Sequence, residues 1–272
     1  MRKIIFIVAL TVSGAAYASP VPQSAAPITI SAAKSLEWDR KAKTYTARQD
    51  VVAAQGTANI HADLLVAHYD EAGGKTNIET LEATGHVTIS SAPYTAYGDR
   101  AVYNVKTGNA VMTGNGLKIV SDDSTLTARD EIDFNSTENR MTAIGTPRAV
   151  KGDNTLTADA MSAVFTKDGT GKMSANKITA KGHVVITTPT ETAAGDDGVY
   201  DVPTQKAVLT GKVTLLQDKN WLEGTRADVD MVTGISRLSG AGNAETEGRV
   251  TGTFYPQQAK KPESPQNEGQ GN

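Results

Sequence analysis

The sequence predicts an all-β protein built from a repeated pair of antiparallel strands, and three observations lead to that prediction. Glycines recur at an interval of about 29 residues, apolar and polar residues alternate around them, and short turn-forming segments separate the alternating stretches. The composition agrees, because 25 glycines and only 5% aromatic residues favour a thin, β-rich core. Helical content is expected to be close to nil after the first eighteen residues.

Seven glycines mark the repeat. Their separations are 29, 29, 31, 37, 29 and 29 residues, and the flanks repeat as well, since GHVTI at Gly85 returns as GHVVI at Gly182. Residues two and four positions from a glycine are mostly apolar or small, whereas those at odd positions are mostly polar. Such alternation predicts a strand with one dry and one wet face. The glycines are Gly56, Gly85, Gly114, Gly145, Gly182, Gly211 and Gly240.

Each repeat contains a second strand, such as residues 94–105, and compact turns join the strands. The turns contain SAP at 91–93 and KTGN at 106–109, and links this short favour antiparallel neighbours. Two strands per repeat, together with a leading hairpin over residues 35–52, give about sixteen strands. After Gly114 the alternation changes phase, which predicts a one-residue bulge.

The two ends of the chain are expected to lie outside the β domain. Residues 1–18 have the pattern of a secretory signal peptide, because Arg2 and Lys3 precede a short apolar stretch and AYA at 16–18 is a typical cleavage site. The apolar stretch is too short to span a bilayer, although an uncleaved anchor is the alternative. We expect residues 19–27 to be a linker, 28–255 the β domain, and 256–272 a disordered polar tail.

Composition and charge argue against several classes of function. The 27 basic and 30 acidic residues form no long run of either sign, which gives no electrostatic case for nucleic-acid binding. Cysteine is absent, and so are the nucleophile elbow, the phosphate loop and the dinucleotide-binding motif. No catalytic residue and no cofactor is therefore predicted.

The four histidines do not have the spacing of a metal site. His86 and His183 occupy the same outward position of the repeat. His61 and His68 are seven residues apart, which on an uninterrupted strand places them on opposite faces. All four are interpreted as solvated surface residues, and no metal is predicted.

The segment LEWDRKAKTYTARQDVVAAQGTANIHADLLVAHYD at 36–70, followed by the Gly-x-Val and GDRAVYN blocks, resembles the OstA-type domain of the LptA family of lipopolysaccharide transport proteins. The resemblance covers roughly residues 32–254. It implies an elongated antiparallel β-jellyroll of about sixteen strands, folded like a V or a taco, whose inner face holds acyl chains. It also implies end strands that stack head to tail across the periplasm. The inner-membrane and outer-membrane relatives fit less well, because one needs a retained anchor helix and the other a long barrel segment.

The apolar positions of the repeat suit a lipid carrier. Exposing a CH₂ group to water costs ~0.8 kcal/mol, so a chain of about twelve carbons carries a penalty of ~9 kcal/mol outside a groove. The dry positions combine aliphatic residues with many alanines and glycines, which leaves space between two facing layers. An ordinary sandwich core has the same composition and is the alternative. The predicted lipid-binding residues are Leu81, Val87, Ile89, Met112, Val184, Ile186, Leu209, Val213 and Leu215.

The ends of the sheet indicate the partners. The first and last strands, expected at 28–32 and 249–255, carry little of the inward charge or proline that prevents edge pairing. We expect strand addition between copies, as a head-to-tail homo-oligomer, and with like-folded inner-membrane and outer-membrane components. Lipopolysaccharide is the expected cargo. The alternative is that the flanking prolines and the tail cap these edges and prevent strand addition.

Two further classes of function stay open at this point. A secreted β-solenoid enzyme acting on polysaccharide would show clustered acidic residues and exposed aromatic residues along a cleft, and a structural repeat protein would have two wet faces. Here the aspartates are dispersed, and Trp38 and Trp221 lie far apart in sequence. Asp228 and Asp230 share a face and are interpreted as residues near a turn. Three tyrosines recur at one position of the repeat and are expected to pack: Tyr69, Tyr103 and Tyr200.

Overall fold

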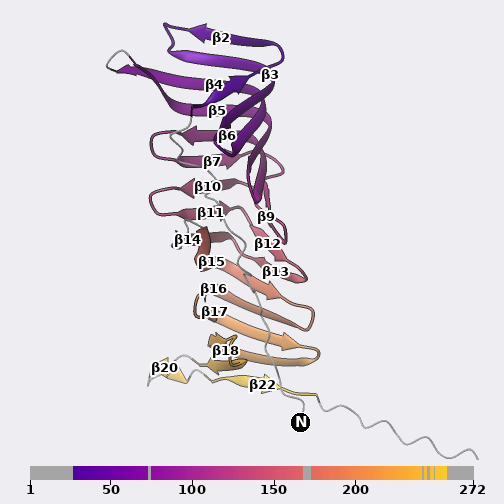
Figure 1. The fold of residues 1–272 in the computed structure, drawn as a ribbon. Coiled ribbons are helices and arrows are strands. Elements are labelled where there is room, and N and C mark those ends of the chain that lie inside the picture. Colours follow the sequence, from indigo (N-terminus) through magenta and orange to yellow (C-terminus); the bar gives the residue numbers. More distant parts are fainter. Residues whose placement is uncertain are drawn as a thin grey trace, which may run out of the picture.

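The computed structural model describes residues 27–72, 75–167, 173–240, 242–243, 246–247 and 249–255. Within these ranges the chain is all-β and contains no helix, and twenty strands form one continuous antiparallel sheet. The strands follow one another in chain order along an elongated stack (Figure 1). The predicted all-β antiparallel fold is confirmed. The predicted signal peptide, most of the predicted linker and the predicted tail lie outside the described residues.

The stack has three parts that differ in strand length. The first part contains β1 (Thr29–Ser31), β2 (Ser35–Asp39), β3 (Thr44–Gln55), β4 (Ala58–Ala72), β5 (Lys75–Ser91) and β6 (Tyr94–Asn104). The middle part contains β7 (Asn109–Thr113), β8 (Lys118–Val120), β9 (Ser124–Thr127), β10 (Glu131–Asn135), β11 (Arg140–Ile144), β12 (Arg148–Lys151), β13 (Asn154–Thr157) and β14 (Ala160–Lys167). The last part contains β15 (Met173–Thr187), β16 (Glu191–Asp201), β17 (Lys206–Gln217), β18 (Asn220–Asp230), β19 (Ile235–Ser239), β20 (Gly242–Asn243), β21 (Thr246–Glu247) and β22 (Thr251–Thr253).

The sheet is folded into two walls that meet at a corner. In the middle part, β7, β10, β11 and β14 pair in series as the first wall, and β8, β9, β12 and β13 pair in series as the second wall. Both walls join β6 on one side and β15 on the other. The long strands cross from one wall to the other where their register shifts, as between Thr84 and Val87 in β5. This arrangement agrees with the V-shaped sheet that the resemblance implied.

The described residues form twenty-two strands, more than the sixteen or so predicted, because the corner divides strands of the middle part in two. Between β7 and β8 the chain passes through Gly114 and Gly116, whose φ angles are 106° and 65°, and the ladder stops from Thr113 to Lys118. The prediction of a one-residue bulge after Gly114 is therefore wrong, since the strand is divided in two. The same division separates β9 from β10, β11 from β12, and β13 from β14.

A glycine and an aspartate meet at each of five corners. The five glycines have φ angles between 71° and 106°, a region that other residues rarely adopt. A side chain at any of them would overlap the carboxylate of an aspartate from the preceding strand. The carboxylates of Asp99 and Asp196 also accept a hydrogen bond from the backbone N–H of the residue after the glycine, as in Asn115 N to Asp99 Oδ2 at 2.7 Å. The five pairs are Asp63–Gly85, Asp99–Gly114, Asp130–Gly145, Asp159–Gly182 and Asp196–Gly211.

The alternation around the glycines places the expected residues on the inner face. In β5, for example, Leu81, Ala83 and Val87 are all buried, and they pack in one core cluster that includes residues of both walls. His86 and His183 lie outside, as expected. The prediction that His61 and His68 occupy opposite faces is wrong. Both lie on the outer face, because a register shift between His61 and Leu64 moves the alternation by one residue.

Candidate functional site

Three cavities lined mostly by apolar side chains lie between the two walls. Their volumes, which include solvent space at their open sides, are about 440, 470 and 850 Å³. Ile89 and Ala110 line both the first and the second cavity. Tyr94, Ile119 and Met141 line both the second and the third. The row of these three cavities is called the groove below.

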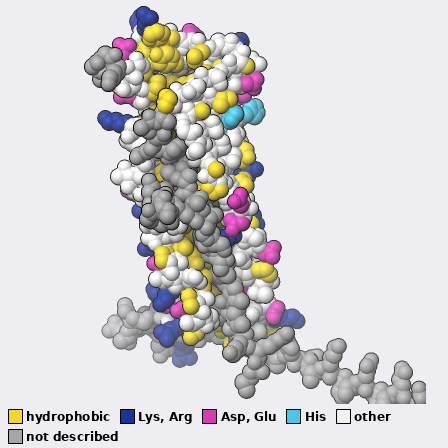
Figure 2. Space-filling model, viewed as in Figure 1, with side chains coloured by type: hydrophobic (Ala, Val, Ile, Leu, Met, Phe, Trp, Pro, Cys, Tyr) yellow, Lys and Arg dark blue, Asp and Glu magenta, His cyan; other side chains and the backbone are white. Residues whose placement is uncertain are grey.

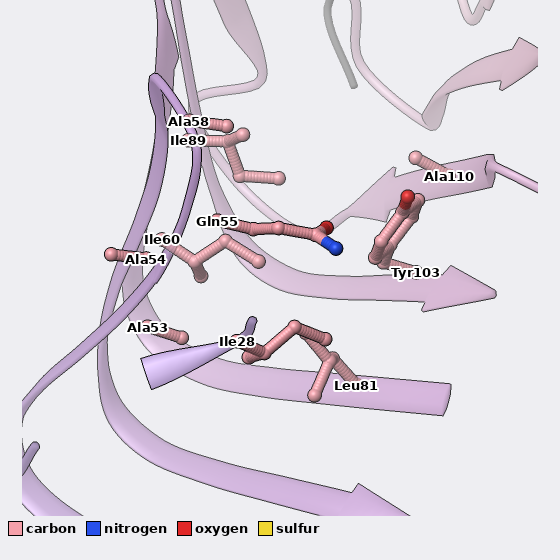
Figure 3. Close-up of a pocket in the computed structure, with 10 residues that line it drawn as sticks. All are labelled: Ile28, Ala53, Ala54, Gln55, Ala58, Ile60, Leu81, Ile89, Tyr103 and Ala110. Atoms are coloured by element: carbon pink, nitrogen blue, oxygen red, sulfur yellow. The ribbon is translucent and has the colours of Figure 1, made fainter. Parts of the chain in front are cut away.

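The first cavity lies near the β1 end of the groove (Figure 3). Leu81 and Tyr103 come from the first wall, Ile60 and Ile89 from the second. The close-up shows the amide of Gln55 extending from the second wall toward Tyr103. Burial raises the pKa of the Tyr103 hydroxyl, so this group stays uncharged. The cavity therefore offers an almost entirely apolar lining.

The second and third cavities continue this lining with larger side chains. Met112, Ile132 and Phe134 line the second cavity from the first wall. The third and largest cavity adds aliphatic residues from both walls and a polar rim of Ser121, Ser124 and Lys151. The Lys151 ammonium is only 16% exposed and lies 3.0 Å from the Asp123 carboxylate. Hydrogen bonds from Ser124 and Lys151 lower the pKa of Asp123, so the pair is charged.

Four of the predicted lipid-binding residues line a cavity. Leu81 lines the first cavity, Ile89 the first and the second, and Met112 the second. Leu215 lines a separate cavity near β22. These four residues lie on the inner face, where a guest between the walls would contact them.

The other five predicted residues are packed in the protein interior. Val87, Val184 and Val213 stand two residues after a corner glycine, and each is 1% exposed. They fill the bottom of the V where the walls meet. Leu209 belongs to the second core cluster, which extends from β13 to β18, and Ile186 is partly buried and packs against that cluster.

Sequence reasoning singled out Ile89, which lines the first and second cavities, but not the residues that line both the second and the third cavity. Met141 stands four residues before Gly145, at an inward position of the repeat, so the alternation of apolar and polar residues could have identified it as a lining residue. Ile119 stands at an odd position because two glycines interrupt the strand before it. Tyr94 follows a turn and carries no repeat signal. These last two residues could be assigned to the groove only after the walls were placed against each other.

The polar residues that the sequence analysis considered have structural roles. Asp230 Oδ1 accepts hydrogen bonds from the backbone of Val232 and Thr233 at 3.0 and 2.9 Å, as expected near a turn. Asp228 binds Arg226 Nε at 2.7 Å. Within the described ranges, no group of three or more His, Asp or Glu residues could hold a metal ion. The same part of the chain contains no helix of the length and apolar character needed to cross a membrane.

The two tryptophans lie far apart in the structure. Tyr69 and Tyr103 are buried, which agrees with the packing role expected for them. Trp38 lies on β2 and Trp221 on β18, toward opposite ends of the stack (Figure 1). The exposed row of aromatic residues expected of a polysaccharide-active solenoid is therefore not formed by these two tryptophans.

Comparisons with known proteins found similar chains. The chain is similar to "Uncharacterized protein R00383" of Rhizobium meliloti (strain 1021), with 29% identity over 151 residues, 53% of this chain and 78% of that protein. It is also similar to the crystal structure of LptH, the LptA homologous periplasmic component of the lipopolysaccharide transport device of Pseudomonas aeruginosa. That match has 15% identity, covers 85% of this chain and 96% of the other, and has a TM-score of 0.22.

A family match covers most of the stack. The model of the family described as "LptA/(LptD N-terminal domain) LPS transport protein" matches residues 30–140 and again residues 125–235. Two overlapping matches are consistent with the internal repeat and with a chain longer than compact members of the family. Together they run from β1 to the first residue of β19. The chain belongs to the LptA/(LptD N-terminal domain) family of LPS transport proteins.

Proposed function

We propose that this protein carries lipopolysaccharide through the periplasm and shelters the acyl chains of lipid A in the groove between its two walls. The observation that carries the proposal is the run of three apolar cavities with shared lining residues. A chain of about twelve carbons gains ~9 kcal/mol when it leaves water, so a continuous apolar trough is a suitable carrier.

Small residues keep the groove open. Alanines stand where a packed core would have larger side chains, and cavities therefore persist between the walls. They include Ala53, Ala58, Ala96, Ala110, Ala149, Ala163 and Ala175. The Lys151–Asp123 pair at the third cavity supplies charged groups at the rim, where a lipid headgroup would meet solvent. The predicted signal peptide over residues 1–18 supports placement in the periplasm.

The sheet ends support assembly with like-folded partners. At one end β1 and β2 pair with β3, and at the other β19 and β22 pair with β18, so each end presents strand edges. Both predicted edge segments thus contain a strand. Leu36 and Trp38 on β2 are exposed, and Figure 2 shows a hydrophobic patch at that end of the stack. Glu37 on β2 and Arg237 on β19 are exposed and opposite in charge, which suits a head-to-tail joint between copies.

The groove proposal is tested by photo-crosslinking in cells. A crosslinking amino acid at Met141, which lines two cavities, should label lipopolysaccharide. The matched control is Ile144 on the same strand, whose side chain is exposed on the outer face. Equal labelling from both positions, or no labelling from Met141 in a folded protein that supports growth, would refute the groove.

The edge proposal is tested by sedimentation of the purified protein. Glu37→Arg should weaken self-association, and the double variant Glu37→Arg/Arg237→Glu should restore it, because the charges are exchanged across the joint. Wild-type protein that stays monomeric at high concentration would show instead that the edges are capped.

A further inference from the structure

A separate cavity of about 400 Å³ lies at the β22 end of the stack. Strand register places its lining on one face. Glu191 of β16 stands opposite Gln217 of β17, which stands opposite Asn220 of β18. Two residues along the same strands, Leu215 stands opposite Leu222. Since directly opposed residues project to the same side of a sheet, Glu191 shares the inner face with these leucines. This space is called the β22 cavity.

Phe254 forms the outer rim of the β22 cavity. Gly252 pairs with Leu222, and a side chain at Gly252 would overlap Leu222 and the Phe254 ring. The glycine therefore lets the ring lie close to Leu222. Phe254 is 63% exposed, so the cavity is open to solvent beside it. An amphiphile can enter there without opening the walls.

Glu191 is the unusual residue of this cavity. It is 8% exposed, and among the residues whose burial the structure describes it is the one acidic or basic residue that is buried. Neither of its carboxylate oxygens has a hydrogen-bond partner among the described residues. Its backbone groups form hydrogen bonds with Thr188: Glu191 N donates to Thr188 Oγ1 at 3.1 Å, and Glu191 O accepts from Thr188 N at 2.9 Å. The carboxyl group is therefore not required to satisfy the backbone and is available to bind a ligand.

Burial alone raises the pKa of Glu191, so no charged side chain in the described part of the chain stabilises its ionised form. A buried acid without a partner is unfavourable for folding. Residues of this kind, located in a cavity, are candidates for a binding role. A cation that arrives with its own apolar chain would satisfy both the carboxylate and the leucine-rich lining.

We propose that the β22 cavity binds the protonated amine of an amphiphile, with the ammonium group on the Glu191 carboxylate and the alkyl chain against Leu215, Leu222 and Phe254. The inference rests on the proposed function, because the amphiphile is then a lipid that the protein carries. It deepens that function by naming a chemical group on the lipid that one end of the protein recognises.

Calorimetry with two simple probes tests the proposal on the full-length mature chain. Decylammonium and decanol have the same alkyl chain and differ in charge. Wild-type protein should bind decylammonium at least tenfold more tightly than decanol. Glu191→Gln should reduce this ratio to below threefold while leaving decanol binding unchanged. Glu223→Gln is the matched control, because it removes an exposed acidic side chain of β18 and should retain the full ratio.

Each other outcome has a defined meaning. An unchanged ratio in Glu191→Gln, or an equal loss in Glu223→Gln, overturns the amine site, because general charge attraction then explains binding.

A second variant, Glu191→Leu, should keep decanol binding, lose the amine preference and melt at a higher temperature than the wild type. If it melts at a lower temperature, the carboxyl group is structural and the amine site is overturned. Decanol binding with no amine preference rejects this inference alone. An amine preference in a protein that never labels lipopolysaccharide from Met141 rejects the groove but keeps the amine site.

Discussion

Replacing Gly211 by alanine should destabilise the protein far more than the same replacement at Gly234. Both glycines have positive φ, 98° and 69°, so both variants bear a backbone strain of about 1–2 kcal/mol. A new methyl group at Gly234 meets no atom within 4 Å, whereas one at Gly211 overlaps the Asp196 carboxylate. Relief of that overlap costs about 1–3 kcal/mol and also removes the hydrogen bond from Lys212 N to Asp196 Oδ2, now 3.2 Å long. With about 1 kcal/mol for the lost hydrogen bond, the expected loss for Gly211→Ala is about 3–6 kcal/mol.

Urea denaturation of the two variants measures this difference. An unchanged slope of the transition shows that the variants and the wild type unfold in the same two-state manner. A double-mutant cycle with Asp196→Gly, which removes the whole side chain including the Cβ that also overlaps the new methyl group, separates the overlap from the backbone strain. With that side chain removed, Gly211→Ala should cost only about 1–2 kcal/mol, the value expected for Gly234→Ala. Equal losses at the two glycines, or strict additivity with Asp196→Gly, would refute the account of the corners.

Three further predictions concern single contacts. The pKa of His183 should lie above its ordinary value of 6.5, because Asp159 Oδ2 lies 2.8 Å from Nδ1. The stability that this pair contributes is then complete below about pH 6.5 and is lost as pH rises through the raised pKa. In an NMR titration, Asp159→Asn should lower the pKa of His183 toward its ordinary value. An unchanged pKa in that variant would contradict the contact. Tyr69→Phe removes the acceptor of the Trp38 indole N–H, 2.8 Å away, and should cost about 0.5–1.5 kcal/mol in thermal unfolding, while an unaltered midpoint would show that water replaces the hydroxyl. Leu65→Ala, at a fully buried position, should cost about 2–5 kcal/mol in urea, and a smaller loss would mean that the core closes around the missing atoms.

The fold class and the inner face of the sheet could be predicted because both depend on local periodicity. The alternation around Gly85 and Gly182 fixes which side of a strand is dry, and short turns fix antiparallel pairing. The strand count could not be predicted, because the change of phase after Gly114 does not distinguish a bulge from the division of the strand at Gly114 and Gly116. The shared face of His61 and His68 was missed for a similar reason, since a register shift between them resets the alternation.

The groove could be predicted only in part. Leu81 and Ile89 stand at inward repeat positions and line cavities, whereas Val87 has the same pattern but lies at the bottom of the V. Sequence distance from the corner decides between these outcomes, and the corner itself is a tertiary feature. Glu191 follows a turn and has the polarity of a surface residue, so its burial depends on how β16 packs against β17 and β18.

Because five successive bends each contain an aspartate and a glycine, lengthening the protein needs no new architecture. A duplicated hairpin would bring its own bend and add its two strands to each wall. The space between the walls would lengthen accordingly. The free energy of unfolding would then change by the intrinsic contribution of the added hairpin plus that of its interface with the neighbouring hairpin, as in other repeat proteins. Chains of different lengths could evolve by duplication, each spanning a different distance with the same interior chemistry.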